Sequence, residues 1–327
     1  MTETAFLLIP IISPQPNSST PAKNKESKPK KNKSNKKSQN KSKSKSTVKL
    51  TKKEFGILLE KFVGIIDGDG YFDIGPQKQY CKNPNRVPKA TIRIRLGINL
   101  QAKDKPLLDY LSAALNIGNV DYQKTKDQYR LLIYKTETIQ VVHSFLVKNQ
   151  IEFLTYERRK QYFRFKYIIE NHIRHWENFN QEEVDKLFEK TNKQYHFTEL
   201  VKLPYYNNWL VGFTIAEGSF HIKEKGTVHF SIVQSGHEDY HIIKAIHYFI
   251  KGPDSFDHII NPEEIMVYRI SFSAKEDLKI IIGFYNHNKL LGLKLIQYTK
   301  WLAYINKHNT LEFKKRIKNN SKKAILP

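Results

Sequence analysis

Cysteine is almost absent from this sequence, because only Cys81 occurs among 327 residues. One cysteine cannot form a disulfide within the chain, and it cannot supply the thiolates of a structural zinc site. Long apolar runs near the N-terminus are also missing. Residues 5–12 are interrupted by Pro10 and are too short to span a bilayer, and they make a poor signal peptide. We therefore expect a fold held by a hydrophobic core, with no membrane partner.

Acidic residues are scarce relative to basic ones, since 32 Asp and Glu face 55 Lys and Arg, giving a formal net charge of +23. Such an excess points to a polyanionic partner, and nucleic acid fits better than an acidic membrane surface. Residues 21–50 hold twelve Lys and a single acid, Glu26. This segment accounts for about half of the excess, so the remainder of the chain is basic in its own right.

The two ends of the chain differ in composition from its middle. Residues 13–47 contain almost no large apolar side chain, so they are expected to stay disordered. A solvated linker, a non-specific DNA tether and a nuclear-import patch remain open as roles for this segment. The organisation we expect is an N-terminal tail (1–50), a first domain (51–171), a linker (172–204), a second domain (205–316) and a basic C-terminal tail (317–327).

Hydrophobic periodicity predicts the same series of elements twice. In the first copy, a helix from the possible N-cap Thr51 to Gly68–Gly70 precedes strands at 71–74 and 90–100, a helix at 105–115, strands near 120 and at 129–134, and helices at 137–148 and 157–171. In the second copy, a helix at 209–216 precedes strands at 219–223 and 228–234, a helix at 240–249, strands at 256–260 and 266–272, and helices at 275–285 and 291–307. The chain is therefore predicted to be a tandem duplication of one α+β unit, with a short helix at 182–189 in the linker.

The two opening helices end in related motifs, FVGIIDGDG at residues 62–70 and LVGFTIAEG at residues 210–218. Gly64 and Gly212 lack a Cβ, so they would let the two helix backbones pack closely against each other. Asp69 and Glu217 stand where the helices end, at the negative end of each helix dipole, where a carboxylate is disfavoured by up to about 1 kcal/mol. Bound divalent cations would remove the repulsion between two such acids.

This motif pair resembles the LAGLIDADG homing endonucleases over residues 52–307. The resemblance implies two pseudo-symmetric αββαββα-type domains, packed through the motif helices, whose antiparallel sheets form a saddle over the DNA major groove. It also implies that Asp69 and Glu217 are catalytic ligands of Mg²⁺, or of another divalent cation such as Mn²⁺. Gly68 and Ala216, which precede the two acids, belong to the metal-binding set that the resemblance implies.

Two further catalytic positions are carried over from the family pattern: Gln234, which would order waters around the metals, and Lys294, which would support the hydrated scissile phosphate. A sheet-face glutamine and a solvated helix lysine are the plain alternatives. The first copy departs from the pattern, because Leu100 stands where Gln234 would fall. Its matching basic residue is Arg158, Arg159 or Lys160.

The strand at 90–100 places Arg93, Arg95 and Asn99 on the face opposite its apolar side chains. Outward side chains of a two-stranded ribbon can reach base edges in the major groove, so we expect these three residues to contact DNA. A solvated strand face is the alternative for each one. The other expected contacts are Gln77, Lys78, His221, Lys223, Lys225, His229 and Ser231.

The resulting hypothesis is a monomeric, site-specific endonuclease that hydrolyses double-stranded DNA with divalent metal ions. An intron RNA maturase, with or without DNA cleavage, is the main alternative, and a non-catalytic DNA-binding regulator is another. Intact Asp69 and Glu217 favour cleavage, because RNA chaperoning has no need for paired acids. The abundance of Lys, Asn, Ile, Tyr and Phe is compatible with an A+T-rich organellar gene. We expect a mitochondrial gene in preference to a chloroplast gene.

Overall fold

The computed structural model describes residues 48–78, 89–224, 226–253, 259–260 and 266–308. The N-terminal tail up to residue 47 and the basic C-terminal tail expected at 317–327 lie outside the described residues. All of the described residues belong to one compact unit. Among them, no helix is both long and apolar enough to cross a membrane.

The first repeat follows the predicted series and ends in both of the helices expected after its fourth strand. Its strands form an antiparallel sheet in the order β1-β2-β4-β3. Thr51 caps the first helix in a capping box with Glu54, as its sequence position indicated. The elements are α1 (Lys52–Asp69), β1 (Gly70–Gln77), β2 (Thr91–Gln101), η1 (Ala102–Asp104), α2 (Lys105–Ala114), β3 (Asn119–Gln123), β4 (Gln128–Ile133), α3 (Thr136–Lys148) and α4 (Tyr156–Glu170).

The second repeat has the same order of elements and the equivalent sheet, β5-β6-β8-β7, also antiparallel. Of the strand expected at 256–260, only Ile259–Ile260 is described. The elements are α7 (Tyr206–Glu217), β5 (Gly218–Ile222), β6 (Val228–Ser235), η3 (His237–Asp239), α8 (Tyr240–Lys251), β7 (Ile259–Ile260), β8 (Val267–Phe272), α9 (Lys275–His287) and α10 (Gly292–Lys307). The linker between the repeats contains η2 (Trp176–Asn178), α5 (Gln181–Thr191) and α6 (Phe197–Leu200).

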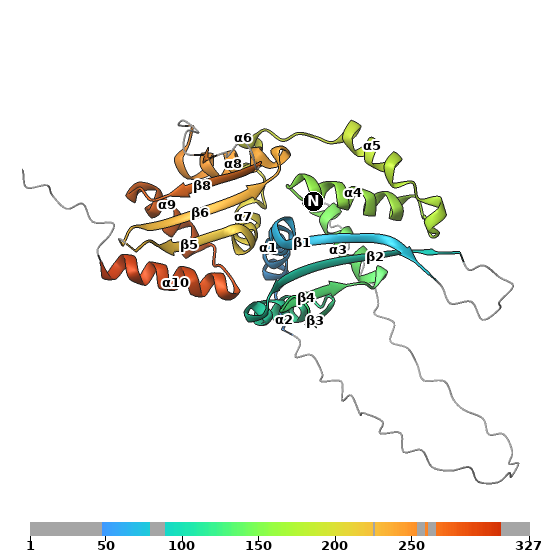
Figure 1. The fold of residues 1–327 in the computed structure, drawn as a ribbon, viewed down its shortest axis with the longest axis horizontal. Coiled ribbons are helices and arrows are strands. Elements are labelled where there is room, and N and C mark those ends of the chain that lie inside the picture. Colours follow the sequence, from blue (N-terminus) through green and yellow to red (C-terminus); the bar gives the residue numbers. More distant parts are fainter. Residues whose placement is uncertain (1–47, 79–88, 225, 254–258, 261–265, 309–327) are drawn as a thin grey trace, which may run out of the picture. The chain divides into compact units, whose positions relative to one another are not determined.

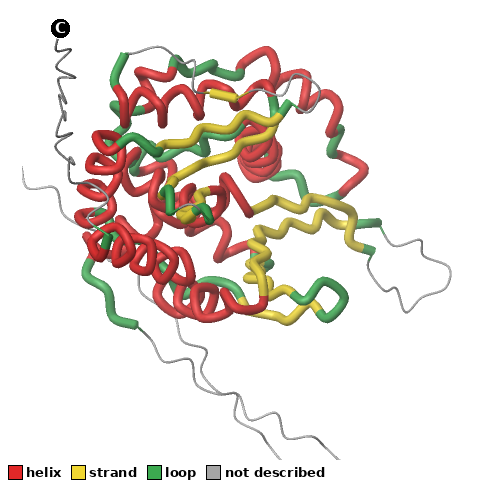
Figure 2. Tube along the Cα trace, turned by 60° about the vertical axis from the view of Figure 1, so that its left-hand side comes forward, coloured by secondary structure: helices red, strands yellow, loops and turns green. Residues whose placement is uncertain are grey.

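Helices α1 and α7 pack directly against each other between the two sheets (Figure 1). Figure 2 shows the sheets as two separate groups of strands. At the crossing, an added Cβ on Gly64 would lie 2.1 Å from the carbonyl oxygen of Trp209, and one on Gly212 would lie 1.9 Å from that of Lys61. Both helix centres are completely buried, and the hydrophobic core continues through them from one repeat to the other. The motif glycines are therefore required by the backbone contact.

The register of each sheet places one face toward the core and the other away from it. In β2, Leu96 and Ile98 are 1% exposed, whereas the alternate Arg93 and Arg95 are partly exposed beside β1. The apolar and basic faces predicted for this strand are therefore present. Gly97, on the basic side, is covered by the ring of Tyr71, since a Cβ there would lie 2.4 Å from that ring.

We predict that Gly212→Ala lowers the free energy of unfolding by about 2–4 kcal/mol, because its methyl group would force the helix backbones apart. Gly56→Ala is the matched control, since Gly56 lies in α1 with no atom within 4 Å of an added Cβ. There the same change should stabilise the protein by about 0.5–1 kcal/mol. Urea unfolding of both variants measures the difference, and equal effects would show that the crossing tolerates a side chain.

Candidate active site

The two motif acids are the last residues of the two packed helices. Asp69 ends α1 and Glu217 ends α7, and the next residue of each chain segment begins a strand. A Cβ on Gly68 would lie 2.3 Å from the Cβ of Ala216 and 3.1 Å from Oε1 of Glu217. The carboxylate of one repeat therefore reaches the helix end of the other, which brings the two acids predicted from sequence into one place.

Both carboxyl groups are held in an environment that disfavours their charge. Burial raises the pKa of Asp69 to about 6, against the smaller opposing effects of Lys294 and Arg158. Burial and the neighbouring charge of Asp69 raise the pKa of Glu217 to about 7. The ends of two helix dipoles add to this cost. The pair is thus destabilised in the absence of a cation and is poised to bind one.

A basic side chain from the last helix of each repeat approaches the acid pair. Nζ of Lys294 donates a hydrogen bond to the carbonyl oxygen of Gly218, directly after Glu217. Nε of Arg158 donates to the carbonyl oxygen of Ile66 at 3.1 Å, near the end of α1. Both basic residues occupy the third position of their helices, α10 and α4. Arg158 is therefore the positional counterpart of Lys294.

Arg159 and Lys160, the other two candidates for that position, point elsewhere. The guanidinium of Arg159 lies over the ring of Tyr195, 5.1 Å from its centroid. Nζ of Lys160 is 2.9 Å from the carboxylate of Glu189 in the linker. Of these three adjacent basic residues, Arg158 is therefore the one whose side chain lies beside the end of α1.

An aspartate from the opposite repeat holds the beginning of each of these two helices. Oδ1 of Asp239 accepts a hydrogen bond from the backbone N–H of Tyr156 at 2.7 Å, and Oδ1 of Asp104 accepts from that of Leu293 at 3.2 Å. Oδ2 of Asp239 also accepts from Nε2 of Gln234 at 2.9 Å. Gln234 therefore bonds to the residue that supports Arg158. These exchanged caps had no signal in the sequence, because each joins residues of different repeats.

Asp67, the sixth residue of the first motif, ties three helices together. Its buried carboxylate accepts hydrogen bonds from the backbone of Leu154 and Thr155, from Oγ1 of Thr155, and from Nε1 of Trp209 at 2.6 Å. These contacts fix the start of α4 and the side of α7 to α1. Burial still raises the pKa of Asp67 to about 6, despite the four donors. Ile215, its counterpart, cannot make such contacts, so the two halves are chemically unequal.

A cavity of about 300 Å³ opens beside Asp69, and Ala216 and Lys294 also contribute to its wall. Oδ1 of Asn99, in the same wall, is buried and has no hydrogen-bond partner among the described residues. Gln101 also lines this cavity and was missed in the sequence, because Leu100 was the residue aligned with Gln234. The register of the sheets supports the alignment of Leu100 with Gln234. The glycine after the motif acid pairs with Ile98 in the first sheet and with Ile232 in the second, and Leu100 and Gln234 each lie two residues beyond that partner.

The donor set fits a divalent cation that completes its shell with water and substrate. Within the described part of the chain, no group of three or more His, Cys, Asp or Glu side chains could hold a metal alone. Mg²⁺ is commonly bound by one or two carboxylates together with substrate phosphates, and two converging, destabilised carboxylates beside an open cavity match that pattern. Gly68 and Ala216, which directly precede Asp69 and Glu217, lie against each other at the ends of α1 and α7.

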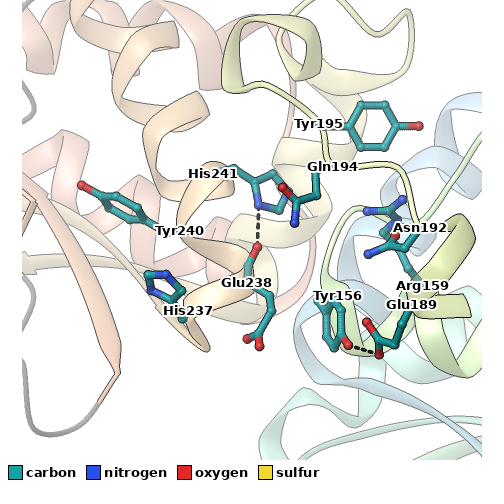
Figure 3. A pocket seen from close by; sticks show the side chains of 10 residues that line it. All are labelled: Tyr156, Arg159, Glu189, Asn192, Gln194, Tyr195, His237, Glu238, Tyr240 and His241. Carbon is teal, nitrogen blue, oxygen red and sulfur yellow. Dashed lines mark hydrogen bonds between the residues drawn. The ribbon is translucent and has the colours of Figure 1, made fainter. Parts of the chain in front are cut away.

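A larger pocket of about 410 Å³ lies apart from the acid pair, between the start of α4, the linker and the start of α8 (Figure 3). Arg159, Tyr195, His237 and His241 belong to its lining, whereas Asp69 and Glu217 do not. His241 is turned to the backbone, with Nδ1 2.7 Å from the carbonyl oxygen of Glu238. The pocket therefore holds none of the residues predicted to be catalytic.

The residues predicted to contact DNA differ in exposure between the two sheets. Arg93, Arg95 and Asn99 lie on one face of the first sheet, and Gln77 and Lys78 lie exposed at the end of β1. In register with Asn99 on the next strand is Arg130, a partly exposed residue of β4 that the sequence reasoning missed.

In the second sheet, His221 and Lys223 are accessible, but His229 and Ser231 are 9% and 8% exposed. The ring of His221 is stacked on that of His229, with centroids 5.3 Å apart. His229 and Ser231 thus offer little surface to a base edge, and their assignment stays a prediction. Lys225 lies outside the described residues.

The fold and the site together define a class: a duplicated α+β protein whose two repeats meet through paired helices that end in facing acids. A family model described as LAGLIDADG endonuclease matches residues 62–169 and 210–305, and the chain belongs to this family. The resemblance inferred from the motifs at residues 62–70 and 210–218 is thereby confirmed.

A curated relative is the probable intron-encoded endonuclease Cox1-I1b of Schizosaccharomyces pombe, which is 25% identical over 260 residues. The match covers 76% of this chain and 64% of that relative. Solved structures with the same fold include the LAGLIDADG homing endonuclease I-LtrWI bound to target DNA, with a TM-score of 0.57 and 17% identity over 78% of this chain and 92% of that one. They also include I-SmaMI bound to uncleaved DNA with calcium ions, with a TM-score of 0.57 and 18% identity over 81% and 94%.

We predict that Glu217→Gln stabilises the metal-free protein above neutral pH. The folded-state pKa of Glu217 is about 7, above its ordinary value of 4.5. The wild-type protein therefore has its full stability below pH 4.5, where Glu217 is protonated in both states, and loses stability as the pH rises toward 7. In EDTA at pH 8 the variant should gain about 1–3 kcal/mol, and at pH 4.5 almost nothing.

Glu182→Gln is the control, because Glu182 is exposed on α5 and forms an ion pair with Lys186, four residues along the helix. Denaturant unfolding at the two pH values distinguishes the variants. A Glu217→Gln protein that is no more stable than the wild type at pH 8 would show that burial and the charge of Asp69 do not destabilise the ionised carboxylate of Glu217.

Proposed function

We propose that this protein is a site-specific homing endonuclease that cleaves both strands of double-stranded DNA by metal-assisted phosphodiester hydrolysis. The observation that carries the proposal is the meeting of Asp69 and Glu217, two buried carboxyl groups with raised pKa values, at the junction of two repeats. A purely structural role gives no reason to place two acids at the negative ends of two helix dipoles.

Bound divalent cations, Mg²⁺ or Mn²⁺, would supply charge stabilisation at the scissile phosphate and a more acidic attacking water. Asp69 and Glu217 would hold these cations, with Gly68 and Ala216 next to them. Each carboxyl group must lose its proton before it can act as a ligand.

Lys294 and Arg158 would place positive charge beside the phosphate undergoing hydrolysis. Both basic side chains are largely buried, and their hydrogen bonds to the carbonyl oxygens of Gly218 and Ile66 keep them in position before substrate arrives. Asp104 and Asp239 hold the helices that carry them. Gln234 would order water near the phosphate from its position beside Asp239.

DNA would lie on the outward faces of the two sheets, where a ribbon of strands can reach base edges in the major groove. The solved relative I-LtrWI is bound to target DNA, which supports DNA as the partner. The net charge of +23 provides the non-specific attraction to phosphates. We further propose that the protein acts as a monomer, because one chain supplies both acids, and that its gene lies in an organelle.

Cleavage is tested with a supercoiled plasmid that carries the host gene without its intron. We expect linear product in Mg²⁺ and none in EDTA, and Asp69→Asn or Glu217→Gln should slow cutting by about 10³-fold or more. Gel analysis of the time course measures this. Absence of cutting, together with faster splicing of the intron transcript, would instead support an intron RNA maturase.

The two basic residues are tested in a second experiment. Lys294→Met and Arg158→Met should each slow cleavage of pre-bound DNA by about 10²-fold, with a much smaller change in Kd, because their charge acts mainly on the reacting phosphate. Arg159→Met is the matched control, since it removes the same charge from the adjacent position of α4. If it slows cleavage as much as Arg158→Met does, the effect is not specific to the site.

A further inference from the structure

Asp73 places a negative charge on the sheet face that carries the predicted base-reading arginines. It lies in β1, in register with Arg95 of β2. Its Oδ1 is 3.1 Å from a terminal nitrogen of Arg93, and its Oδ2 is 3.7 Å from one of Arg95. One carboxylate thus holds two guanidinium groups, one on each oxygen, and we call these three residues the arginine triad.

The backbone of β1 leaves room for this arrangement. Gly75 pairs with Arg93 in the register, and a Cβ at Gly75 would lie only 3.1 Å from the guanidinium nitrogen. The Arg93 side chain can therefore lie across β1 toward Asp73. Each of the three side chains is about one-third exposed, so their free edges face the surface that DNA would approach.

Stability alone does not account for an acid at this position. Partly exposed ion pairs contribute about 0.2–1 kcal/mol to folding, whereas a carboxylate on a DNA-facing surface repels every phosphate that comes near it. Asp73 also reduces the local charge of the two arginines from +2 to +1. The cost to general DNA affinity suggests a gain in selectivity.

We propose that Asp73 is a specificity-determining residue that fixes Arg93 and Arg95 for contacts to guanine in one half-site. Arginine pairs with O6 and N7 of guanine through two parallel N–H groups, which requires a fixed guanidinium plane. Holding that plane in the free protein lowers the entropy cost of binding. Neutralising part of the charge makes the same arginines poorer partners for phosphates at other sequences.

This inference rests on the proposed DNA-binding function, and the test separates the two. Wild-type protein, Asp73→Asn and Asp121→Asn are used to select binding sites from a randomised DNA library, which is then sequenced. Asp121 lies in β3 on the same sheet face, in register with Arg130, and within the described residues it forms no ion pair. The control therefore changes the charge equally and leaves the triad intact.

We expect the wild type and Asp121→Asn to enrich guanine at one or two adjacent positions of one half-site. Asp73→Asn should lower that preference by about tenfold, bind unrelated DNA more tightly, and show a salt dependence steeper by about one phosphate contact. A cooperative thermal unfolding transition close to that of the wild type confirms that the sheet of the variant is intact.

Two results would overturn the role of Asp73. One is an equal loss of preference in Asp73→Asn and Asp121→Asn, and the other is a wild-type site without guanine in either half. A wild-type protein that enriches no sequence at all would instead contradict the proposed function itself.

Discussion

The backbone contact between α1 and α7 is the constraint on which the rest of the molecule depends. Gly64 and Gly212 leave no space for a side chain, so the two helices approach until the carbonyl group of one faces the glycine of the other. This approach sets the relative position of the two repeats. It also brings two helix ends together, and with them Asp69 and Glu217, whose pKa values are raised mainly because both carboxyl groups are buried at this junction.

Contacts between the repeats reinforce this arrangement. Asp104 and Asp239 each cap the last helix of the opposite repeat, so the basic residue of one half is positioned by an acid of the other half. Asp67 adds a link that Ile215 cannot provide. The start of α4 is therefore held by two carboxylates and the start of α10 by one. The two repeats therefore place a basic residue beside a motif acid in the same way, but they differ in the residues that support it.

The fold was largely predictable, because hydrophobic periodicity and the repeated motif are local signals. The motif acids were predictable for the same reason. The position of Arg158 was not predictable, because it depends on a contact between segments more than eighty residues apart. The arginine triad was not predictable either, because it depends on the register of two paired strands. The low exposure of His229 also depends on its neighbour across the strand, His221, which a single-strand pattern cannot show.

The central claim is that divalent cations bind between the ends of these two helices. Its most direct test is anomalous diffraction from crystals of the protein grown with Mn²⁺ and a DNA duplex carrying the selected site. The account predicts anomalous peaks within about 2.5 Å of carboxylate oxygens of both Asp69 and Glu217. Peaks only at other positions, with the two carboxylates turned away from each other, would contradict it.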